Sequence, residues 1–411
     1  MSTYDVLTDE NGEQRLVGQA HFTQGRALST TFVYDNAYLT DNGRNIDPAL
    51  QLASGPQHQS GLLRAFADSA PDRWGRNLLD KAERLAARED GRVPRQLDDV
   101  SYLLGVSDDT RQGALRFRLP GDDSFLAPAA HVPQLISLPE LLRRSDELAN
   151  EDDPVVAIKQ LLDTGTTGLG GARPKASVRL EDGSLGFAKF PHAADGWDVM
   201  AWEATTLELL TAAGIAVPEH RLTRLGGRSV LILRRFDRDG AQRRIGYISA
   251  MTATGASDGD HRDYADIADG IRDIAAAPKA ALAQLYDRVA ASVALGNTDD
   301  HLRNHGFLTD GKLWKLSPAF DVNPNPDLGK RRSTSIAGAD TFPDEIEGLL
   351  AFADDCGLSR PQARERLSRI GAALTAWSDA ARSCRIAEAE IRRMAEGIRP
   401  RLEAVIAAGR A

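Results

Sequence analysis

A chain of 411 residues is too long for one ordinary hydrophobic core, so two or three domains or lobes are expected. The net charge of −9 argues against broad, charge-driven binding to nucleic acid. No apolar run is long enough to span a membrane, and the N-terminus lacks the basic and apolar segments of a secretory signal. The two cysteines form no CxxC pair, which fits the reducing cytoplasm and excludes a structural zinc finger. We therefore expect a cytoplasmic protein without membrane contact.

The N-terminal part of the chain is expected to contain strands followed by a helix. Residues 4–35 include β-forming residues and a tight turn at Asn11-Gly12, which predicts paired strands. Residues 60–87 place their apolar side chains on one stripe at helical spacing, which predicts a helix. The polar, proline-containing stretch 119–139 is the best candidate for a domain boundary, and a helix is expected at 138–149.

The rest of the chain changes from strands to helices. A β-rich pattern covers about 170–236, interrupted by one helix near 197–213, and its expected strands are 176–180, 185–190, 219–224 and 229–233. Beyond residue 260, the expected helices are 263–275, 279–295, 343–355, 360–382 and 385–408, the last with a kink at Pro400. This order predicts an α+β, two-lobed, protein-kinase-like fold with a β-rich N-terminal module and a mostly helical C-terminal lobe. The expected divisions are a module at 1–120, a connecting segment and helix at 121–149, a β-rich lobe with a hinge at 150–240, and a helical lobe at 241–411.

The segment Asn297-Thr298-Asp299-Asp300-His301-Leu302-Arg303-Asn304 has the spacing of a kinase catalytic loop. Asp299 and Asn304 stand five residues apart, the Asp-x-x-x-x-Asn interval in which the Asp accepts the substrate hydroxyl proton and the Asn holds a magnesium ion. Asp300 does not give this interval, so we assign the proton acceptor to Asp299. Asp321, after the next strand, would hold the metal that bridges the ATP phosphates. The alternative is an Asn-Asp turn that caps a helix, which explains each residue singly but not the spaced set.

Lys189 lies in a short apolar run, 186–190, that is expected to be a strand. A single cation in such a strand is typical of the kinase lysine that binds the α- and β-phosphates of ATP. Its usual partner is a glutamate on the next helix, and Glu203 lies 14 residues further on. The alternative is a lysine on an edge strand that points into solvent.

Three further features carry weaker signals. The glycine-dense loop 165–175 could bring backbone amides close to phosphate, but it matches neither the P-loop nor the G-x-G-x-x-G pattern and could equally be a connector. Segment 234–238 falls where a kinase hinge would lie, although its charges are also those of an ordinary strand end. The basic run 330–332 is interpreted as a solvated loop, and His301 as a hydrogen-bond donor that orders the catalytic loop rather than a metal ligand.

Together, these segments resemble the HipA family of serine/threonine protein kinases, the toxins of type II toxin–antitoxin systems. The resemblance is strong over about 170–325 and looser in the N-terminal part, at 71–76 and 113–115. The matching segments are Gly170-Gly171-Ala172-Arg173-Pro174-Lys175, Phe187-Ala188-Lys189-Phe190, Arg235-Phe236-Asp237-Arg238, residues 296–307 and Leu316-Ser317-Pro318-Ala319-Phe320-Asp321.

The resemblance implies ATP and Mg²⁺ as cofactors and assigns roles to residues. Asp299 would be catalytic, and Asn304 and Asp321 would bind the metal. The nucleotide would be contacted by the phosphate-binding Lys189, by Lys175 in the phosphate-side loop, by the hinge backbone from Arg234 to Phe236, and by the neighbouring Asp237 and His301. Known substrates of the family include aminoacyl-tRNA synthetases, whose phosphorylation halts translation. The usual partner is a small helix-turn-helix, HipB-like antitoxin, through which operator DNA is bound indirectly.

One position departs from the family pattern. Family members switch themselves off by phosphorylating a serine seven residues before the lysine that matches Lys175, and this chain has Gly168 there. Autophosphorylation, if retained, is therefore expected on Thr166 or Thr167.

Two alternative functions remain open. A small-molecule kinase could use the same fold, although it has no need of the N-terminal module. A catalytically idle corepressor module, partnered with a DNA-binding antitoxin, would not need to retain Asp299, Asn304, Asp321 and Lys189 together.

Overall fold

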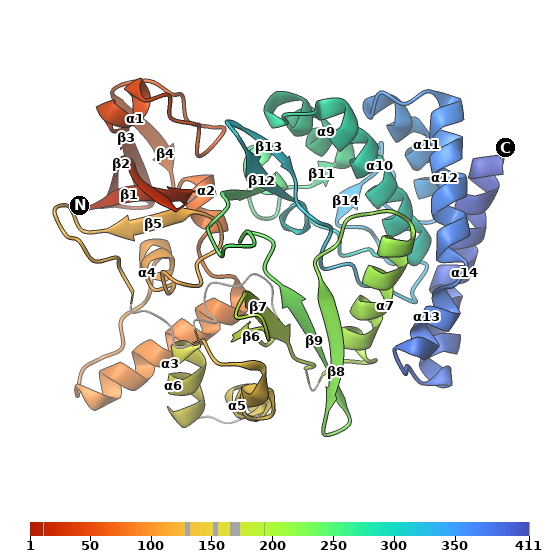
Figure 1. Cartoon of the computed structure of the whole chain (residues 1–411), viewed down its shortest axis with the longest axis horizontal. Coiled ribbons are helices and arrows are strands. Elements are labelled where there is room, and N and C mark those ends of the chain that lie inside the picture. Colours follow the sequence, from red (N-terminus) through yellow and green to blue (C-terminus); the bar gives the residue numbers. More distant parts are fainter. Residues whose placement is uncertain (11, 128–131, 151–154, 165–172, 193, 411) are drawn as a thin grey trace. The chain divides into compact units, whose positions relative to one another are not determined.

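The computed structural model describes residues 1–10, 12–127, 132–150, 155–164, 173–192 and 194–410 (Figure 1). The chain forms two compact units. The first contains Met1–Ala194 and Ile232–Ile248, and the second contains Asp195–Leu231 and Ser249–Ala411. Segment 232–248 thus leaves the second unit and returns to the first. In the part of the chain that the structure describes, no helix is both long and apolar enough to cross a membrane.

The first unit begins with a five-stranded sheet of order β4-β3-β2-β1-β5. Its antiparallel strands are β1 (Ser2–Glu10), β2 (Glu13–Gln24), β3 (Leu28–Tyr34), β4 (Pro56–Ser60) and β5 (Leu115–Arg118). Strand alternation buries Phe22, Phe32 and Phe117 on one side, where they meet Phe66 in edge-to-face ring contacts. The strands expected over 4–35 are therefore present.

Three short helices and one longer helix, α3, are described beside this sheet in the sequence. They are α1 (Asn36–Thr40), α2 (Arg64–Asp68), α3 (Arg73–Glu89) and α4 (Asp99–Leu104). The single helix expected over 60–87 is thus two helices, α2 and α3. Pro71 separates them, because proline lacks an N–H donor and disfavours a helical conformation at the residue before it.

The remainder of the first unit carries the β-rich segment. Helices α5 (Leu138–Asn150) and α6 (Val155–Asp163) precede the strands β6 (Lys175–Arg179) and β7 (Leu185–Lys189). These strands are antiparallel, and the C-terminal end of β9 (Arg228–Arg234) continues the sheet in the order β6-β7-β9. The strands lie within a residue or two of their expected positions, as does the helix expected at 138–149.

The second unit is mostly helical. It contains α7 (Val199–Ala212), the hairpin of β8 (His220–Leu225) with the start of β9, α8 (Ala250–Ala253), α9 (Tyr264–Ile274), α10 (Pro278–Leu295) and the hairpin β12 (Gly306–Asp310) with β13 (Leu313–Leu316). Helices α11 (Asp344–Asp355), α12 (Arg360–Leu374), α13 (Trp377–Ser383) and α14 (Glu388–Arg410) follow, with α14 packed against both α10 and α12. Two short strands, β11 (Arg262–Asp263) and β14 (Thr334–Ser335), pair in parallel.

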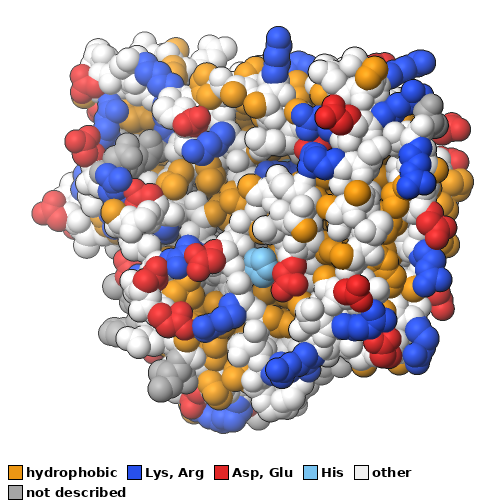
Figure 2. Space-filling view, turned by 45° about the vertical axis from the view of Figure 1, so that its right-hand side comes forward, with side chains coloured by type: hydrophobic (Ala, Val, Ile, Leu, Met, Phe, Trp, Pro, Cys, Tyr) orange, Lys and Arg blue, Asp and Glu red, His pale blue; other side chains and the backbone are white. Residues whose placement is uncertain are grey.

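This arrangement confirms the α+β class, with one further local correction: the expected helix 360–382 is broken into α12 and α13. The expected catalytic loop lies between α10 and the β12–β13 hairpin. Helix α14 continues through Pro400. On the face shown in Figure 2, acidic and basic side chains are interspersed among the described residues, in keeping with the mixed charges of the sequence.

Candidate active site

The candidate catalytic loop begins where α10 stops. Gly296 ends the helix with φ of 69°, the left-handed conformation that glycine adopts without a steric penalty. A side chain would also be tight there, because a Cβ would lie 3.1 Å from the carbonyl oxygen of Asn325. The chain therefore turns sharply out of a buried helix and delivers residues 297–301 as a loop.

The two adjacent aspartates of this loop have different environments. Asp299 is exposed, whereas Asp300 is buried. The Asp300 carboxylate accepts hydrogen bonds from the hydroxyls of Tyr264 and Ser292, and Nε2 of His305 lies 3.0 Å from its other oxygen. Burial alone raises the pKa of Asp300, but the charge and hydrogen bonds of His305 and the Tyr264 hydroxyl outweigh it, so the pKa is lowered. Asp300 thus holds the loop together from inside, whereas Asp299 is exposed on its surface.

Asn304 is oriented by the backbone of Asp299. Its Nδ2 donates to the Asp299 carbonyl oxygen at 2.9 Å. Because a carbonyl can only accept, the amide nitrogen must be the atom on this side, and the amide oxygen faces away from the contact. The Asp-x-x-x-x-Asn spacing therefore folds into one linked turn, closed by the 3-10 helix Leu302–Asn304.

Asp321 lies on a second segment that is tied to the same loop. The side chain of Asn323 donates to Asp321 Oδ1 at 3.3 Å, and the backbone N–H of Asn323 donates to Asn297 Oδ1, also at 3.3 Å. Asp321 itself has φ of 57°, a conformation that costs a non-glycine residue free energy and is concentrated at functional sites.

The donor chemistry of these residues suits magnesium. An Asn amide oxygen and an Asp carboxylate are hard oxygen ligands, and Mg²⁺ is commonly held by one or two carboxylates together with substrate phosphates and water. Within the described ranges, no group of three or more His, Cys, Asp or Glu side chains is placed to bind a metal by itself. Asn304 and Asp321 thus fit a metal that arrives with its nucleotide.

Segment 332–334 is attached to the catalytic loop, residue by residue. The backbone N–H of Ser333 donates to the Thr298 carbonyl at 2.9 Å, and the Thr334 hydroxyl donates to the Asp300 carbonyl at 2.7 Å. Arg332 is buried, and its Nε donates to Glu345 at 3.0 Å. The interpretation of 330–332 as a solvated loop is therefore wrong for Arg332, although Lys330 and Arg331 are exposed.

In the first unit, the two candidate phosphate-binding lysines are direct cross-strand partners. Lys175 on β6 lies opposite Lys189 on β7, so both side chains project from the same face of the sheet. Both are buried, and the Trp74 indole N–H donates to the Lys175 carbonyl at 3.2 Å. Lys189 is therefore not a lysine that points into solvent from an edge strand. Two ammonium groups on one face form an arrangement suited to a polyanion.

The other residues expected to contact the nucleotide, and the expected partner of Lys189, differ in their burial. Glu203 is buried in α7, and its pairing with Lys189 stays a prediction. His301 is exposed, and the buried His305 contacts Asp300 instead. Phe236 is partly exposed, with its ring 6.3 Å from that of Tyr247. Thr166, Thr167 and Gly168 fall outside the described residues.

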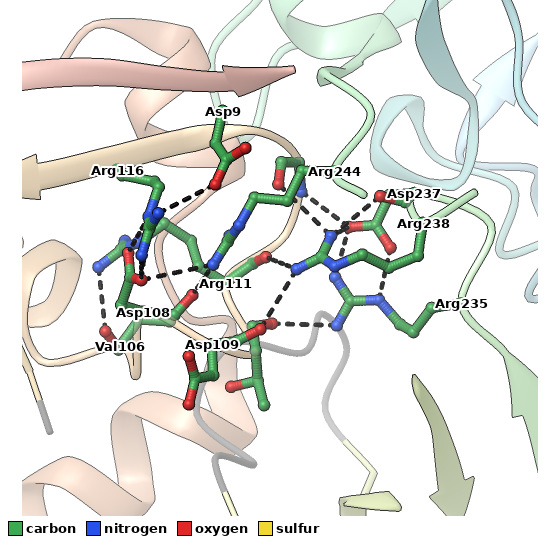
Figure 3. Close-up of polar contacts among 12 residues, drawn as sticks. Asp9, Val106, Asp108, Asp109, Arg111, Arg116, Arg235, Asp237, Arg238 and Arg244 are labelled. Carbon is green, nitrogen blue, oxygen red and sulfur yellow. Dashed lines mark hydrogen bonds and ion pairs between the residues drawn. The ribbon is translucent and has the colours of Figure 1, made fainter. Parts of the chain in front are cut away.

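The hinge candidate 234–238 contains a cluster of ion pairs that is hydrogen-bonded to residues 109–113 of the N-terminal module (Figure 3). Arg235 and Arg238 both bind the Asp237 carboxylate, with Nε of Arg235 2.7 Å from Oδ1 and Nη1 of Arg238 2.9 Å from Oδ2. The same two arginines donate to the backbone carbonyls of residues 109–111. Burial alone raises the pKa of Asp237, but Arg235 and Arg238 lower it overall. Arg234, by contrast, turns outward to pair with Asp182 at 2.9 Å.

Several residues of the site gave no clear sequence signal. Tyr264, His305 and Glu345 come from separate helices and loops, so nothing local reveals that they share one network. Arg332 lay in a basic run whose charge suggested exposure. The available signal was its position shortly after Asp321, where kinases place the activation segment.

Comparison with known proteins identifies the family. The model of the HipA-like C-terminal domain matches residues 167–377, and that of the HipA N-terminal domain matches residues 11–118. The chain belongs to the HipA family. A curated relative, Y4mE of Sinorhizobium fredii, whose name proposes it as a kinase, is 24% identical over 388 residues, covering 87% of each chain.

A solved HipA structure supports the same fold. HipA of Shewanella oneidensis MR-1, determined with HipB and its operator DNA, aligns over 99% of this chain and 96% of its own with a TM-score of 0.65 and 17% identity. The proinflammatory kinase CtkA of Helicobacter pylori aligns over 59% of this chain and 93% of its own, with a TM-score of 0.40 and 16% identity, which is too distant to support an argument. The expected kinase-like fold of HipA proteins is thus confirmed.

Proposed function

We propose that this HipA-family chain is a Mg-ATP-dependent serine/threonine protein kinase. The proposal rests on the arrangement of the catalytic loop: an exposed Asp299 whose backbone orients Asn304, beside a buried Asp300 that fixes the loop. An ordinary capping turn does not require this division of roles between two adjacent aspartates.

In the proposed reaction, the substrate hydroxyl oxygen attacks the γ-phosphorus of ATP and Asp299 accepts the hydroxyl proton. The bond between the γ-phosphorus and the β,γ-bridging oxygen breaks, so that ADP leaves. Asn304 and Asp321 would hold the Mg²⁺, which supplies charge stabilisation to the phosphates when bound. Lys175 and Lys189 would bind the nucleotide phosphates from one face of their sheet, with Glu203 as a partner of Lys189. The backbone of 234–236 would contact adenine, and Asp237 and His301 would lie near the nucleotide.

The biological role that best fits the family is that of the toxin in a type II toxin–antitoxin system. The Shewanella relative was solved with HipB and operator DNA, which supports a small helix-turn-helix antitoxin as the partner here. The target would be a protein such as an aminoacyl-tRNA synthetase, whose phosphorylation would arrest translation. The cytoplasm is the compartment where such partners occur.

The direct test is transfer of labelled γ-phosphate from ATP to the proteins of a cell extract. The wild type should transfer phosphate, and Asp299→Asn and Asp321→Asn should lose on the order of 10²–10⁴ in rate. Asp310→Asn, an exposed aspartate at the end of β12, should behave as the wild type. Equal activity of the wild type, Asp299→Asn and Asp321→Asn would discard the kinase proposal. Label on small molecules alone would favour the small-molecule kinase, and no transfer by the wild type would favour the idle corepressor.

A further inference from the structure

We infer that Ser333 is a positioning residue for Asp299, and that the buried side chain of Arg332 fixes the position of Ser333. This inference rests on the proposed kinase function. It assigns to segment 332–334 a role in orienting the carboxylate that accepts the substrate proton.

The contact is direct. The Ser333 hydroxyl donates to Asp299 Oδ1 at 3.3 Å, while the Ser333 backbone N–H donates to the neighbouring Thr298 carbonyl at 2.9 Å. Two contacts from one residue fix both where the hydroxyl lies and which carboxylate oxygen it meets. An exposed Asp side chain would otherwise rotate among its conformers. With this hydrogen bond on Oδ1, we expect Oδ2 to be the oxygen that receives the proton.

The residues next to Ser333 determine that Ser333, and not a neighbour, contacts Asp299. Burial alternates along this segment: Arg332 and Thr334 are buried, whereas Ser333, at a bend between them, is exposed. The Thr334 hydroxyl donates to the Asp300 carbonyl, and Thr334 and Ser335 pair with β11. A shift by one residue would bury Ser333 and expose a guanidinium, so the pairing strongly favours the observed register.

Arg332 anchors the segment from the buried side. Its guanidinium donates to Glu345 at 3.0 Å, to Ser292 at 3.1 Å and to the Tyr264 hydroxyl at 3.4 Å. Ser292 and Tyr264 are the same hydroxyls that donate to Asp300, so one network joins both aspartates of the loop. Arg401 donates to the other oxygen of Glu345 at 3.2 Å. Burial alone lowers the pKa of Arg332, but Tyr264 and Glu345 raise it overall, so the anchor stays charged.

Removing the Ser333 hydroxyl should change the rate of phosphate transfer. Loss of one hydrogen bond to the base leaves the base present but less well oriented, which should lower the rate of transfer about 5- to 10-fold and not abolish it. Because the contact does not involve nucleotide-binding residues, KM for ATP should be unchanged. Threonine keeps the hydroxyl and should therefore keep the activity.

The test compares the full-length wild type with Ser333→Ala and Ser333→Thr, using Ser257→Ala, an exposed serine of the same unit, as the control. We expect kcat of Ser333→Ala to fall about 5- to 10-fold at constant KM for ATP, and that of Ser333→Thr and Ser257→Ala to stay within about twofold. Unchanged kcat in Ser333→Ala, or equal damage in Ala and Thr variants, would overturn the inference.

A second measurement separates this inference from the proposed function. Crystal structures of the wild type and Ser333→Ala should show one Asp299 conformer in the former and a rotated or mixed carboxylate in the latter. The same single conformer in both would refute the positioning role whether or not the chain transfers phosphate. A kinase proposal that failed would instead appear as equal activity of the wild type and Asp299→Asn.

Discussion

The backbone N–H of Gly113 donates to the Asp237 carboxylate at 2.8 Å, joining residues 124 positions apart in the chain. Gly113 follows α4 in the N-terminal module, and Asp237 follows β9 in the hinge candidate. Within the first unit, this bond and the arginines around it connect the module matched as the HipA N-terminal domain to the segment expected to contact adenine.

Gly113→Ala should destabilise the protein more than a comparable glycine substitution elsewhere. Gly113 has φ of 76°, and a Cβ would lie 3.2 Å from the backbone nitrogen of Tyr247. Gly121 has φ of 80° with open space around it, so Gly121→Ala measures the cost of the backbone conformation alone, about 1–2 kcal/mol. Thermal unfolding should show a larger drop for Gly113→Ala. Equal drops would mean that the contact with Tyr247 and Asp237 adds nothing.

Asp237 should make stability depend on pH in the acid range. The pKa of Asp237 is lower in the folded protein than in the unfolded chain, where an Asp side chain has a pKa of about 4. The stabilisation is therefore complete above that value and is lost as the pH falls below it towards the folded pKa. Asp237→Asn should be destabilised by about 3–5 kcal/mol at neutral pH and should lose less additional stability on acidification than the wild type. The measurement is the unfolding midpoint of the wild type and of Asp237→Asn between pH 6 and 3. If this assignment is wrong, the midpoints of the two proteins will fall in parallel.

Arg332→Lys should impair activity although the charge is retained. A lysine has no planar fork to reach Glu345 and Ser292 together, so we expect a loss of about 1–3 kcal/mol in stability and roughly tenfold in transfer rate. Arg331→Lys is the matched control, because the Arg331 side chain is 78% exposed and pairs with Asp340 at the surface. Similar behaviour of the two variants in denaturation and transfer assays would contradict the anchoring role.

Transfer should require Mg²⁺ through Asp321. Chelation of divalent metal should abolish transfer in the wild type, and Asp321→Asn should need at least about tenfold more Mg²⁺ for half-maximal rate, because an amide lacks the carboxylate charge. A titration of ATP turnover with Mg²⁺ measures this directly. An unchanged Mg²⁺ requirement in Asp321→Asn would remove this residue from the metal site.

Autophosphorylation, if retained, should fall on Thr166 or Thr167, since Gly168 replaces the serine used by other family members. Phosphopeptide mass spectrometry after incubation with ATP should detect phosphate within residues 164–177. The double variant Thr166→Ala/Thr167→Ala should lose that signal. A phosphate-free peptide in the active wild type would exclude this mode of self-inactivation.

The sequence predicted local features well and long-range partnerships poorly. The strands β6 to β9 and the Asp299/Asn304 turn depend on alternation and fixed spacing, which are local properties. The network of Tyr264, Asp300 and Arg332 depends on contacts between three segments that are far apart in the sequence. Local sequence patterns do not predict such contacts. The basic run 330–332 predicts exposed side chains, because charged runs usually face solvent. Arg332 is buried instead, because it pairs with Glu345.

The cluster around Asp237 has a practical consequence for dissecting this chain. A fragment starting at residue 150 would retain Arg235, Asp237 and Arg238 but remove Gly113 and the carbonyls of 109–111 that they bind. The guanidinium groups of Arg235 and Arg238 would then keep the Asp237 carboxylate but lose the backbone carbonyls that accept their other hydrogen bonds. We therefore expect that the C-terminal part of the chain does not keep its structure when the N-terminal module is removed, and that this module is a structural part of the protein rather than an accessory attached to it.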